Sequence, residues 1–178
     1  MKVTIFNGSP RKDDSTASAT SLLAEMMAAS GADVNEHFLY YLNIKGCLTC
    51  GIGGRGKENA CTMVNELISS DAAVLASPIY MWNMADPLKS LMEVLCAICR
   101  DDSDAVRSLE GKKMAAVFAT DDGNEVAEAA AKPLRALCDN FRIRYTGTLT
   151  VPFTDRDKIS EEQFRISVRN FADMIMKV

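Results

Sequence analysis

The residues with the clearest chemical potential lie near the start of the chain, between a short apolar run and an alanine-rich segment. The run 3–6 is typical of a buried strand, and 16–30 has helical spacing. Between them stand side chains that suit a phosphate group: Ser9, Arg11, Ser15 and Thr16. The start of a helix offers unpaired N–H groups and a partial positive charge, to which hydroxyls and a guanidinium add donors. The alternative is an ordinary helix capped by Ser15 or Thr16.

This turn differs from the common nucleotide-binding loops. It has neither the G-x-G-x-x-G pattern of dinucleotide-binding turns nor the G-x-x-x-x-G-K-[ST] pattern of ATP- and GTP-binding loops. The sequence therefore favours a single terminal phosphate held by hydroxyls and backbone, and argues against a nucleotide hydrolase.

A second segment, 77–84, is apolar and aromatic although it follows a strand and should form a loop. Loops are usually polar and exposed, so this composition suits contact with a flat ring whose edges are polar. The candidate ring contacts are Pro78, Ile79, Tyr80, Met81, Trp82 and Asn83. The alternatives are packing against the next helix or a contact between subunits.

A third segment, Thr120–Asn124, is small and polar, and Asp121 and Gly123 are its candidates for contact with the ring's edge. A plain turn and helix cap is the alternative, since two aspartates do not favour an anionic ring nearby.

Strand and helix patterns alternate along the chain and must position these segments. The expected strands are 3–6, 34–39, 72–76, 113–119 and 145–151. The expected helices are 16–30, 63–69, one that opens at Asp86-Pro87, 125–141 and 161–176. Thr62 should cap the second helix, Pro133 should kink or restart the fourth, and a capping box should start the last. This alternation predicts one α/β domain over residues 1–178, with a five-stranded parallel sheet in the flavodoxin-like order 2-1-3-4-5. Ligands bind such sheets at the carboxyl ends of the strands, where the three segments should meet.

Composition excludes several classes of function. A chain of 178 residues with net charge −4 lacks the excess of basic residues that broad nucleic-acid binding requires. It has no apolar run near the ~20 residues that span a bilayer, and its first residues show no signal-peptide pattern. We therefore expect a cytoplasmic protein that acts on neither nucleic acid nor membrane.

Two motifs together resemble the NADPH-dependent FMN reductase family. They are Gly8-Ser9-Pro10-Arg11-Lys12 followed by Ser15-Thr16, and Ser77-Pro78-Ile79-Tyr80 followed by Pro87-Leu88-Lys89. The resemblance covers nearly the whole chain and is closest to the branch with iron–sulfur flavoproteins. It implies a flavodoxin-like fold, non-covalent FMN and a homodimer with the flavin near the interface. It also implies phosphate contacts from Ser9, Arg11, Ser15 and Thr16, and isoalloxazine contacts from 78–83.

The chain departs from the family at two places. The family's loop commonly has Gly-Asn before the final threonine, where this chain has Asp14-Ser15. Carboxylates at Asp13 and Asp14 are unfavourable beside a phosphate unless they turn outward.

The cysteines form the second departure. The iron–sulfur branch places four cysteines after the second strand, whereas this chain has Cys47, Cys50 and Cys61. We expect no cluster, because four thiolates are needed to hold one. Free thiols, zinc with an outside ligand, and a disulfide remain alternatives; His37 should face solvent. The other three cysteines, Cys96, Cys99 and Cys138, are expected to pack in the core.

The sequence thus predicts an FMN-dependent oxidoreductase in which NAD(P)H reduces the flavin, and the flavin reduces a small acceptor such as free flavin, a quinone, an azo- or nitro-aromatic, or ferric iron. No protein catalytic group or metal is expected, because the cofactor carries the chemistry. The alternatives are a flavodoxin-type electron carrier without NAD(P)H turnover, and a flavin-free dimeric interaction module.

Overall fold

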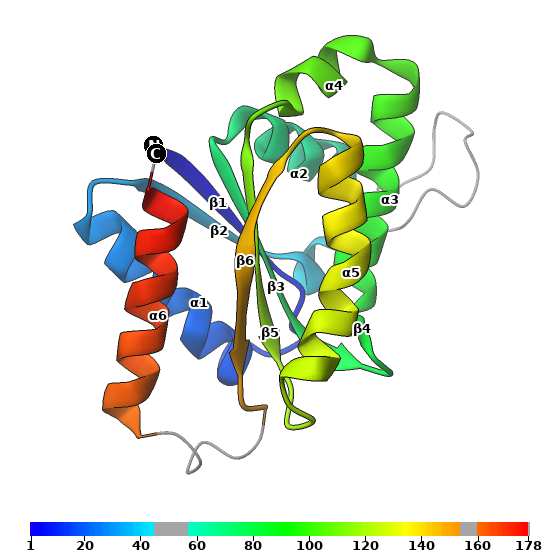
Figure 1. Cartoon of the computed structure of the whole chain (residues 1–178). Coiled ribbons are helices and arrows are strands. Elements are labelled where there is room, and N and C mark those ends of the chain that lie inside the picture. Colours follow the sequence, from blue (N-terminus) through cyan, green and yellow to red (C-terminus); the bar gives the residue numbers. More distant parts are fainter. Residues whose placement is uncertain (45–56, 154–159, 178) are drawn as a thin grey trace.

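The structure, a computed structural model, describes residues 1–44, 57–153 and 160–177. Its centre is a parallel sheet in the order β2-β1-β3-β5-β6, to which the two-residue strand β4 adds an antiparallel pair with β3 (Figure 1). The strands are β1 (Lys2–Asn7), β2 (Asp33–Phe38), β3 (Ala72–Tyr80), β4 (Asn83–Met84), β5 (Lys113–Ala119) and β6 (Arg144–Val151). Counted without β4, this is the predicted flavodoxin-like order 2-1-3-4-5, which the structure confirms.

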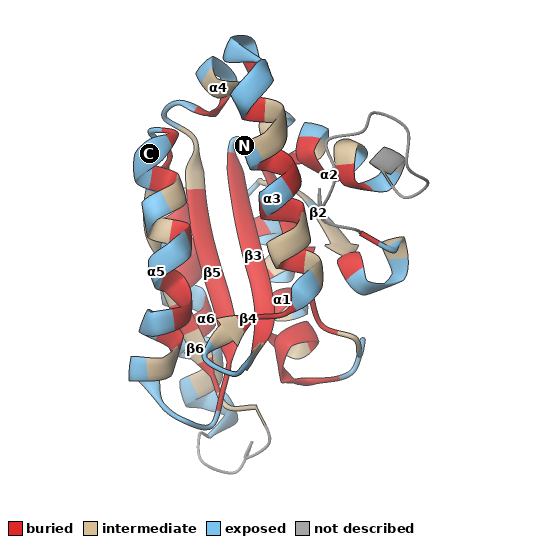
Figure 2. Cartoon of the chain, turned by 90° about the vertical axis from the view of Figure 1, so that its right-hand side faces the viewer, coloured by how far each residue is buried: buried red, intermediate tan, exposed pale blue. Residues whose placement is uncertain are grey.

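Helices cover both faces of the sheet. α1 (Ser15–Ala29) and α6 (Glu161–Met176) pack on one face, and α2 (Lys57–Ser69), α3 (Asp86–Asp101), α4 (Ser103–Leu109) and α5 (Asn124–Asn140) pack on the other. A short 3-10 helix, η1 (Leu39–Leu42), follows β2. Figure 2 shows β3 and β5 buried between the helices. None of the helices in the described ranges is long and apolar enough to cross a lipid bilayer.

The core explains why the middle strands are continuously apolar. Successive residues of β3 point to opposite faces, so Val74 packs with α1 and α6 while Leu75 packs with α2, α3 and α5. Each such side chain is fully buried and contributes about 1.5–3 kcal/mol relative to an exposed one.

β3 is longer than predicted. We expected it to end before Ser77-Pro78, because proline cannot donate to a sheet ladder; instead it continues to Tyr80. Its ladder with β1 stops at Ala76, whereas its ladder with β5 continues to Pro78. At Pro78, β3 therefore has a neighbouring strand on one side only. The N–H that proline lacks is not needed for the ladder with β1, because that ladder has already ended.

Helix boundaries differ from the sequence prediction at several points. α2 begins at Lys57, so Thr62 lies within it, and Ala85 rather than Asp86 is the N-cap of α3. α4, capped by the carboxylate of Asp102, was not predicted.

The expected interruption at Pro133 is absent, since α5 is one continuous helix. Pro133 and Ala129 are both exposed, so water can supply the donor that the carbonyl four residues earlier loses. The capping box of Ser160 and Gln163 on α6 is confirmed.

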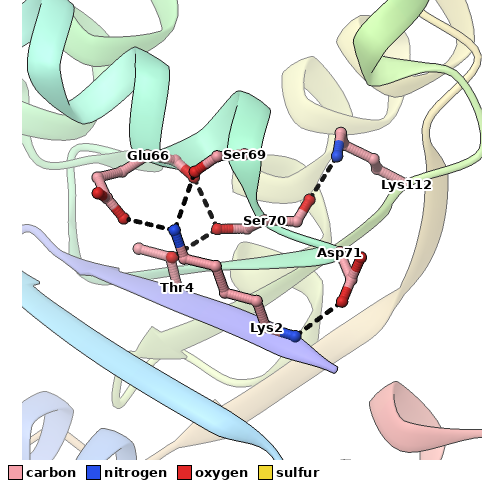
Figure 3. A network of polar contacts seen from close by, with 7 residues as sticks. All are labelled: Lys2, Thr4, Glu66, Ser69, Ser70, Asp71 and Lys112. Carbon is pink, nitrogen blue, oxygen red and sulfur yellow. Dashed lines mark hydrogen bonds and ion pairs between the residues drawn. The ribbon is translucent and has the colours of Figure 1, made fainter.

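A polar network ties the amino ends of β1 and β3 to the end of α2, opposite the candidate site (Figure 3). The hydroxyls of Thr4 and Ser70 lie 2.6 Å apart, and Ser70 Oγ donates to the carbonyl of Glu66 at 2.6 Å. Lys112 Nζ donates to the Ser70 carbonyl at 2.6 Å, and partial burial lowers the pKa of Lys112. The network fixes the end of the sheet opposite the candidate site.

Candidate functional site at the carboxyl edge of the sheet

Four chain segments meet at the carboxyl ends of the strands. They are the turn from β1 to α1, the β3–β4 hairpin, the turn from β5 to α5 and the residues after β6 (Figures 1 and 2). Three of them are the segments that the sequence singled out, and the edge is where doubly wound sheets bind ligands.

Gly8 brings the first turn close to the sheet and to α3. Its N–H donates to the Ala76 carbonyl at 2.8 Å, and a Cβ at this position would lie 3.1 Å from Leu88 Cγ. The next residue, Ser9, donates its N–H to Asn7 Oδ1 at 2.9 Å. A Cβ at Gly8 would contact the Leu88 side chain tightly, so glycine suits the close approach of this turn to α3.

The N-cap of α1 is Asp14, so the predicted cap at Ser15 or Thr16 is wrong. Asp14 Oδ1 accepts a hydrogen bond from the N–H of Ala17 at 2.9 Å, three residues later. Aspartate caps as well as serine, and its negative charge also matches the positive end of the helix dipole.

The four predicted phosphate contacts all lie around this turn, but they differ in what they bind. Ser9 Oγ donates a short hydrogen bond to Asp14 Oδ2, and Ser15 Oγ donates to the Phe153 carbonyl at 3.0 Å. The guanidinium of Arg11 lies over the Phe153 ring, 5.9 Å from its centroid. Within the described residues, Thr16 Oγ1 is buried without a hydrogen-bond partner.

The predicted ring contacts form the end of β3 and a tight hairpin. Pro78, Ile79 and Tyr80 end the strand, Asn83 begins β4, and the loop residues Met81 and Trp82 have φ angles of 50° and 58°. Ser77 Oγ fixes the base of the hairpin, because it accepts from the N–H of Ala85 at 2.8 Å.

Two positive φ values are typical of a type I′ turn, which normally has Asn-Gly. Larger side chains cost about 1–2 kcal/mol each in this conformation, yet Met81 and Trp82 are 84% and 64% exposed. Strained backbone that holds apolar side chains in solvent is typical of a binding surface rather than of a fold requirement.

Phe153 joins the predicted segments, although the sequence analysis missed it. Its N–H donates to Asp121 Oδ1 at 2.9 Å and its carbonyl accepts from Ser15 Oγ. Its ring meets the Tyr80 ring edge-on at a centroid distance of 6.1 Å. One signal could have revealed it: Phe153 follows the last strand at the same sheet edge.

The remaining members of the predicted set lie in the turn before α5. Gly123, with φ 85°, is the N-cap residue of α5, and Asp121 binds Phe153 as described. These residues are thus brought to the same edge as the first turn.

A second aromatic group also escaped sequence reasoning. The Tyr41 hydroxyl donates to the Pro10 carbonyl at 3.0 Å, and Lys12 Nζ lies 4.8 Å from the centroid of the Tyr41 ring. Lys12 also lies 5.4 Å from the Phe38 ring. Each of the two cationic side chains of the first turn therefore lies against an aromatic ring: Arg11 against Phe153, and Lys12 against Tyr41 and Phe38.

The structure tests the prediction that three cysteines pack in the core. Cys99 and Cys138 are buried as predicted, and burial raises their pKa values to about 11 and about 12. Cys96 is exposed, so its predicted core position is wrong. Cys47 and Cys50 lie outside the described residues. His37 is half-buried rather than facing solvent; its ring stacks on Phe6 and its Nε2 is enclosed.

The site fits the two ends of a flavin mononucleotide unequally. The exposed apolar hairpin beside Tyr80 and Phe153 suits a flat ring. The start of α1, where a phosphate would bind, already holds the Asp14 carboxylate. The described residues thus fit the ring, and do not fit the phosphate in this arrangement.

Comparisons with known proteins found similar sequences and similar folds. An iron–sulfur flavoprotein of Methanocaldococcus jannaschii is 28% identical over 149 residues, covering 80% of this chain and 72% of its own. Among solved structures, an NAD(P)H:quinone oxidoreductase from Methanothermobacter marburgensis has a TM-score of 0.73 at 15% identity, over 100% of this chain and 97% of that chain. An FMN-dependent NADH-azoreductase from Bacillus anthracis in complex with FMN has a TM-score of 0.71 at 14% identity, over 99% and 100%.

The two solved structures share the fold at low sequence identity. The family itself is shown by a sequence match: the family model for NADPH-dependent FMN reductase covers residues 1–154, which include every predicted contact and Phe153. The two motifs and the flavodoxin-like sheet therefore have one explanation: the chain belongs to the NADPH-dependent FMN reductase family.

Proposed function

We propose that the chain is a flavin-dependent oxidoreductase that takes hydride from NAD(P)H and passes electrons to a small acceptor. The observation that carries the proposal is the convergence of three segments on Phe153. Ser15 and Arg11 come from the first family motif, Tyr80 comes from the second, and Asp121 comes from the turn after β5. A flavin bound there would supply reversible two-electron chemistry.

The chain's own residues would bind and orient the two rings. Tyr80, Met81 and Trp82 offer apolar surface at the mouth of the site, and Ser77 holds their hairpin on the sheet. No acid, base or nucleophile of the protein is needed, because the protein's part is to align the rings and exclude water.

We further propose that a second copy of the chain completes the site as a homodimer. The exposed side chains of Met81 and Trp82 support this, since soluble proteins seldom leave such apolar clusters open. Closed two-fold pairing is the commonest outcome for such a surface. A quinone or an azo-aromatic is the acceptor class we favour, in line with the substrates named for the two structural neighbours.

The test is turnover. Purified protein with added flavin, an NAD(P)H donor and a quinone should oxidise the donor well above the rate of flavin alone. Trp82→Ala should reduce this rate at least about tenfold, the scale of one misaligned ring, while Ile166→Ala, an exposed apolar residue on α6, should not. If flavin binds but NAD(P)H is not oxidised, the chain is a carrier; if flavin does not bind, it is an interaction module.

A further inference from the structure

The carboxylate of Asp14 occupies the position at the start of α1 where an anion would bind. Asp14 Oδ1 accepts from the Ala17 N–H at 2.9 Å, and Oδ2 accepts a short hydrogen bond from Ser9 Oγ. The residue is 7% exposed. The Asp14 carboxylate thus uses the helix end and one of the hydroxyls that a flavin phosphate would need.

The other phosphate donors are also committed to partners within the chain. Ser15 Oγ donates to the carbonyl of Phe153, and the Arg11 guanidinium lies over the Phe153 ring. Of the three candidate hydroxyls, only that of Thr16 has no partner among the described residues, and it is buried. Of these three hydroxyls, a phosphate at this turn would find only the enclosed one of Thr16 without a partner in the described ranges, and it would meet the Asp14 carboxylate beside it.

From this geometry we propose that Asp14 determines which flavin the site accepts: it disfavours the 5′-phosphate of FMN and favours flavins with an uncharged ribityl tail, such as riboflavin. The proposal rests on the proposed flavin site. It concerns only the tail of the flavin, since the hairpin and Phe153 would contact the ring of either compound alike.

Charge and hydrogen bonding both support this selection. A phosphate beside Asp14 would place like charges together at a site with little water, where their repulsion is stronger than in bulk solvent. If Asp14 instead moved away, Ser9 Oγ and the Ala17 N–H would lose their present acceptor. An uncharged tail requires neither change, because hydroxyls can bond to the carboxylate where it stands.

The experiment compares the dissociation constants of riboflavin and FMN, measured by quenching of flavin fluorescence, for the wild type and three variants. Asp14→Asn removes the charge but keeps an oxygen that can cap α1, and Asp14→Ser keeps a cap with a shorter side chain. Asp13→Asn is the matched control, because it removes the same charge from the exposed neighbouring position.

We expect the wild type to bind riboflavin at least as tightly as FMN. Asp14→Asn and Asp14→Ser should tighten FMN binding by about tenfold or more and leave riboflavin binding nearly unchanged. A change of about tenfold lies between the effects expected from the repulsion of two charges in bulk water and near a protein surface. Inorganic phosphate should then compete with FMN in these variants but not in the wild type. Thermal melting of each variant establishes that it is folded.

Two results would overturn the proposal. One is a wild type that binds FMN at least about tenfold more tightly than riboflavin, as a phosphate-anchored site would. The other is an equal gain in FMN affinity from Asp13→Asn and Asp14→Asn, which would indicate net charge rather than a residue in the anion position. If no folded form binds either flavin, the proposed function itself fails, and this inference with it.

Discussion

At the scale of single residues, Phe153 connects the first turn, the hairpin and the turn after β5 more directly than any residue that the motifs mark. It combines a backbone that bonds Asp121 and Ser15 with a ring that lies between Tyr80 and Arg11. Its two roles can be separated by substitution, because the backbone bonds persist when the ring is removed.

We expect Phe153→Leu to weaken riboflavin binding by roughly 0.5–1.5 kcal/mol, the scale of one aromatic contact. The temperature of unfolding should change little, since Phe153 is only partly buried. Isothermal titration and thermal melting measure the two effects. Equal flavin affinity in the variant and the wild type would remove the ring of Phe153 from the site.

A second residue-scale expectation concerns alkaline pH. Burial raises the pKa of Cys138 from 9.0 to about 12, so the folded state holds a neutral thiol where the unfolded chain would ionise. That contribution to stability is complete below the unfolded pKa and is lost as pH rises through the folded value. The free energy of unfolding in urea should therefore fall between about pH 9 and pH 12, and fall less steeply in Cys138→Ala. If the free energy of unfolding fell equally steeply with pH in the wild type and in Cys138→Ala, Cys138 would not be the group responsible.

At the scale of elements, the β3–β4 hairpin sacrifices stability for exposed apolar surface. Met81 and Trp82 occupy the two positive-φ positions of a tight turn that Asn-Gly would fill without strain. The turn conformation favours Asn-Gly, and the chain has Met-Trp instead. Such a departure from local preference is expected where function rather than folding determines the residues.

The double variant Met81→Asn/Trp82→Gly should be more stable than the wild type by about 1–2 kcal/mol. It relieves backbone strain at both positions, and the extra freedom of glycine in the unfolded chain offsets part of that gain. It should also lose most flavin binding. Urea unfolding and fluorescence titration report the two quantities. A variant that is less stable than the wild type would show that the hairpin side chains stabilise the fold rather than the site.

The network at the opposite end of the sheet gives a prediction with its own internal control. Ser70 Oγ donates its one proton to the Glu66 carbonyl, so Thr4 Oγ1 must be the donor in the Thr4–Ser70 pair. Thr4→Val removes one net hydrogen bond, worth about 0.5–1.5 kcal/mol, whereas Ser70→Ala leaves the buried Thr4 hydroxyl without its acceptor, at about 1–3 kcal/mol. Chemical denaturation of both variants should show Ser70→Ala to be the less stable; the reverse order would contradict this direction of donation.

At the scale of the whole molecule, the order of strands and the edge that carries the site could be predicted from the sequence. Alternating strand and helix patterns define the parallel sheet, and chain connectivity leaves few orders. Contacts that depend on distant segments could not be predicted: Phe153 becomes part of the site only because β6 lies beside β5. Asp14 and Ser15 both suit a helix cap, so local preference alone could not choose between them.

The proposed dimer is also a whole-molecule prediction. Light scattering on the flavin-loaded protein should give twice the protomer mass of 19.4 kDa. Trp82→Ala should shift this mass toward one protomer, and Ile166→Ala on α6 should not. A wild-type mass of one protomer at micromolar concentration would exclude the dimer and the shared site.

The central claim is that the chain itself catalyses electron transfer from a nicotinamide to a flavin held at the carboxyl edge of the sheet. The most direct measurement is a single turnover: flavin-loaded protein is mixed with NADPH or NADH without oxygen, and the yellow absorbance of the flavin is followed. We predict complete bleaching that is faster than for free flavin and slower in Trp82→Ala than in the wild type. A bound flavin that stays yellow with both donors would contradict the account.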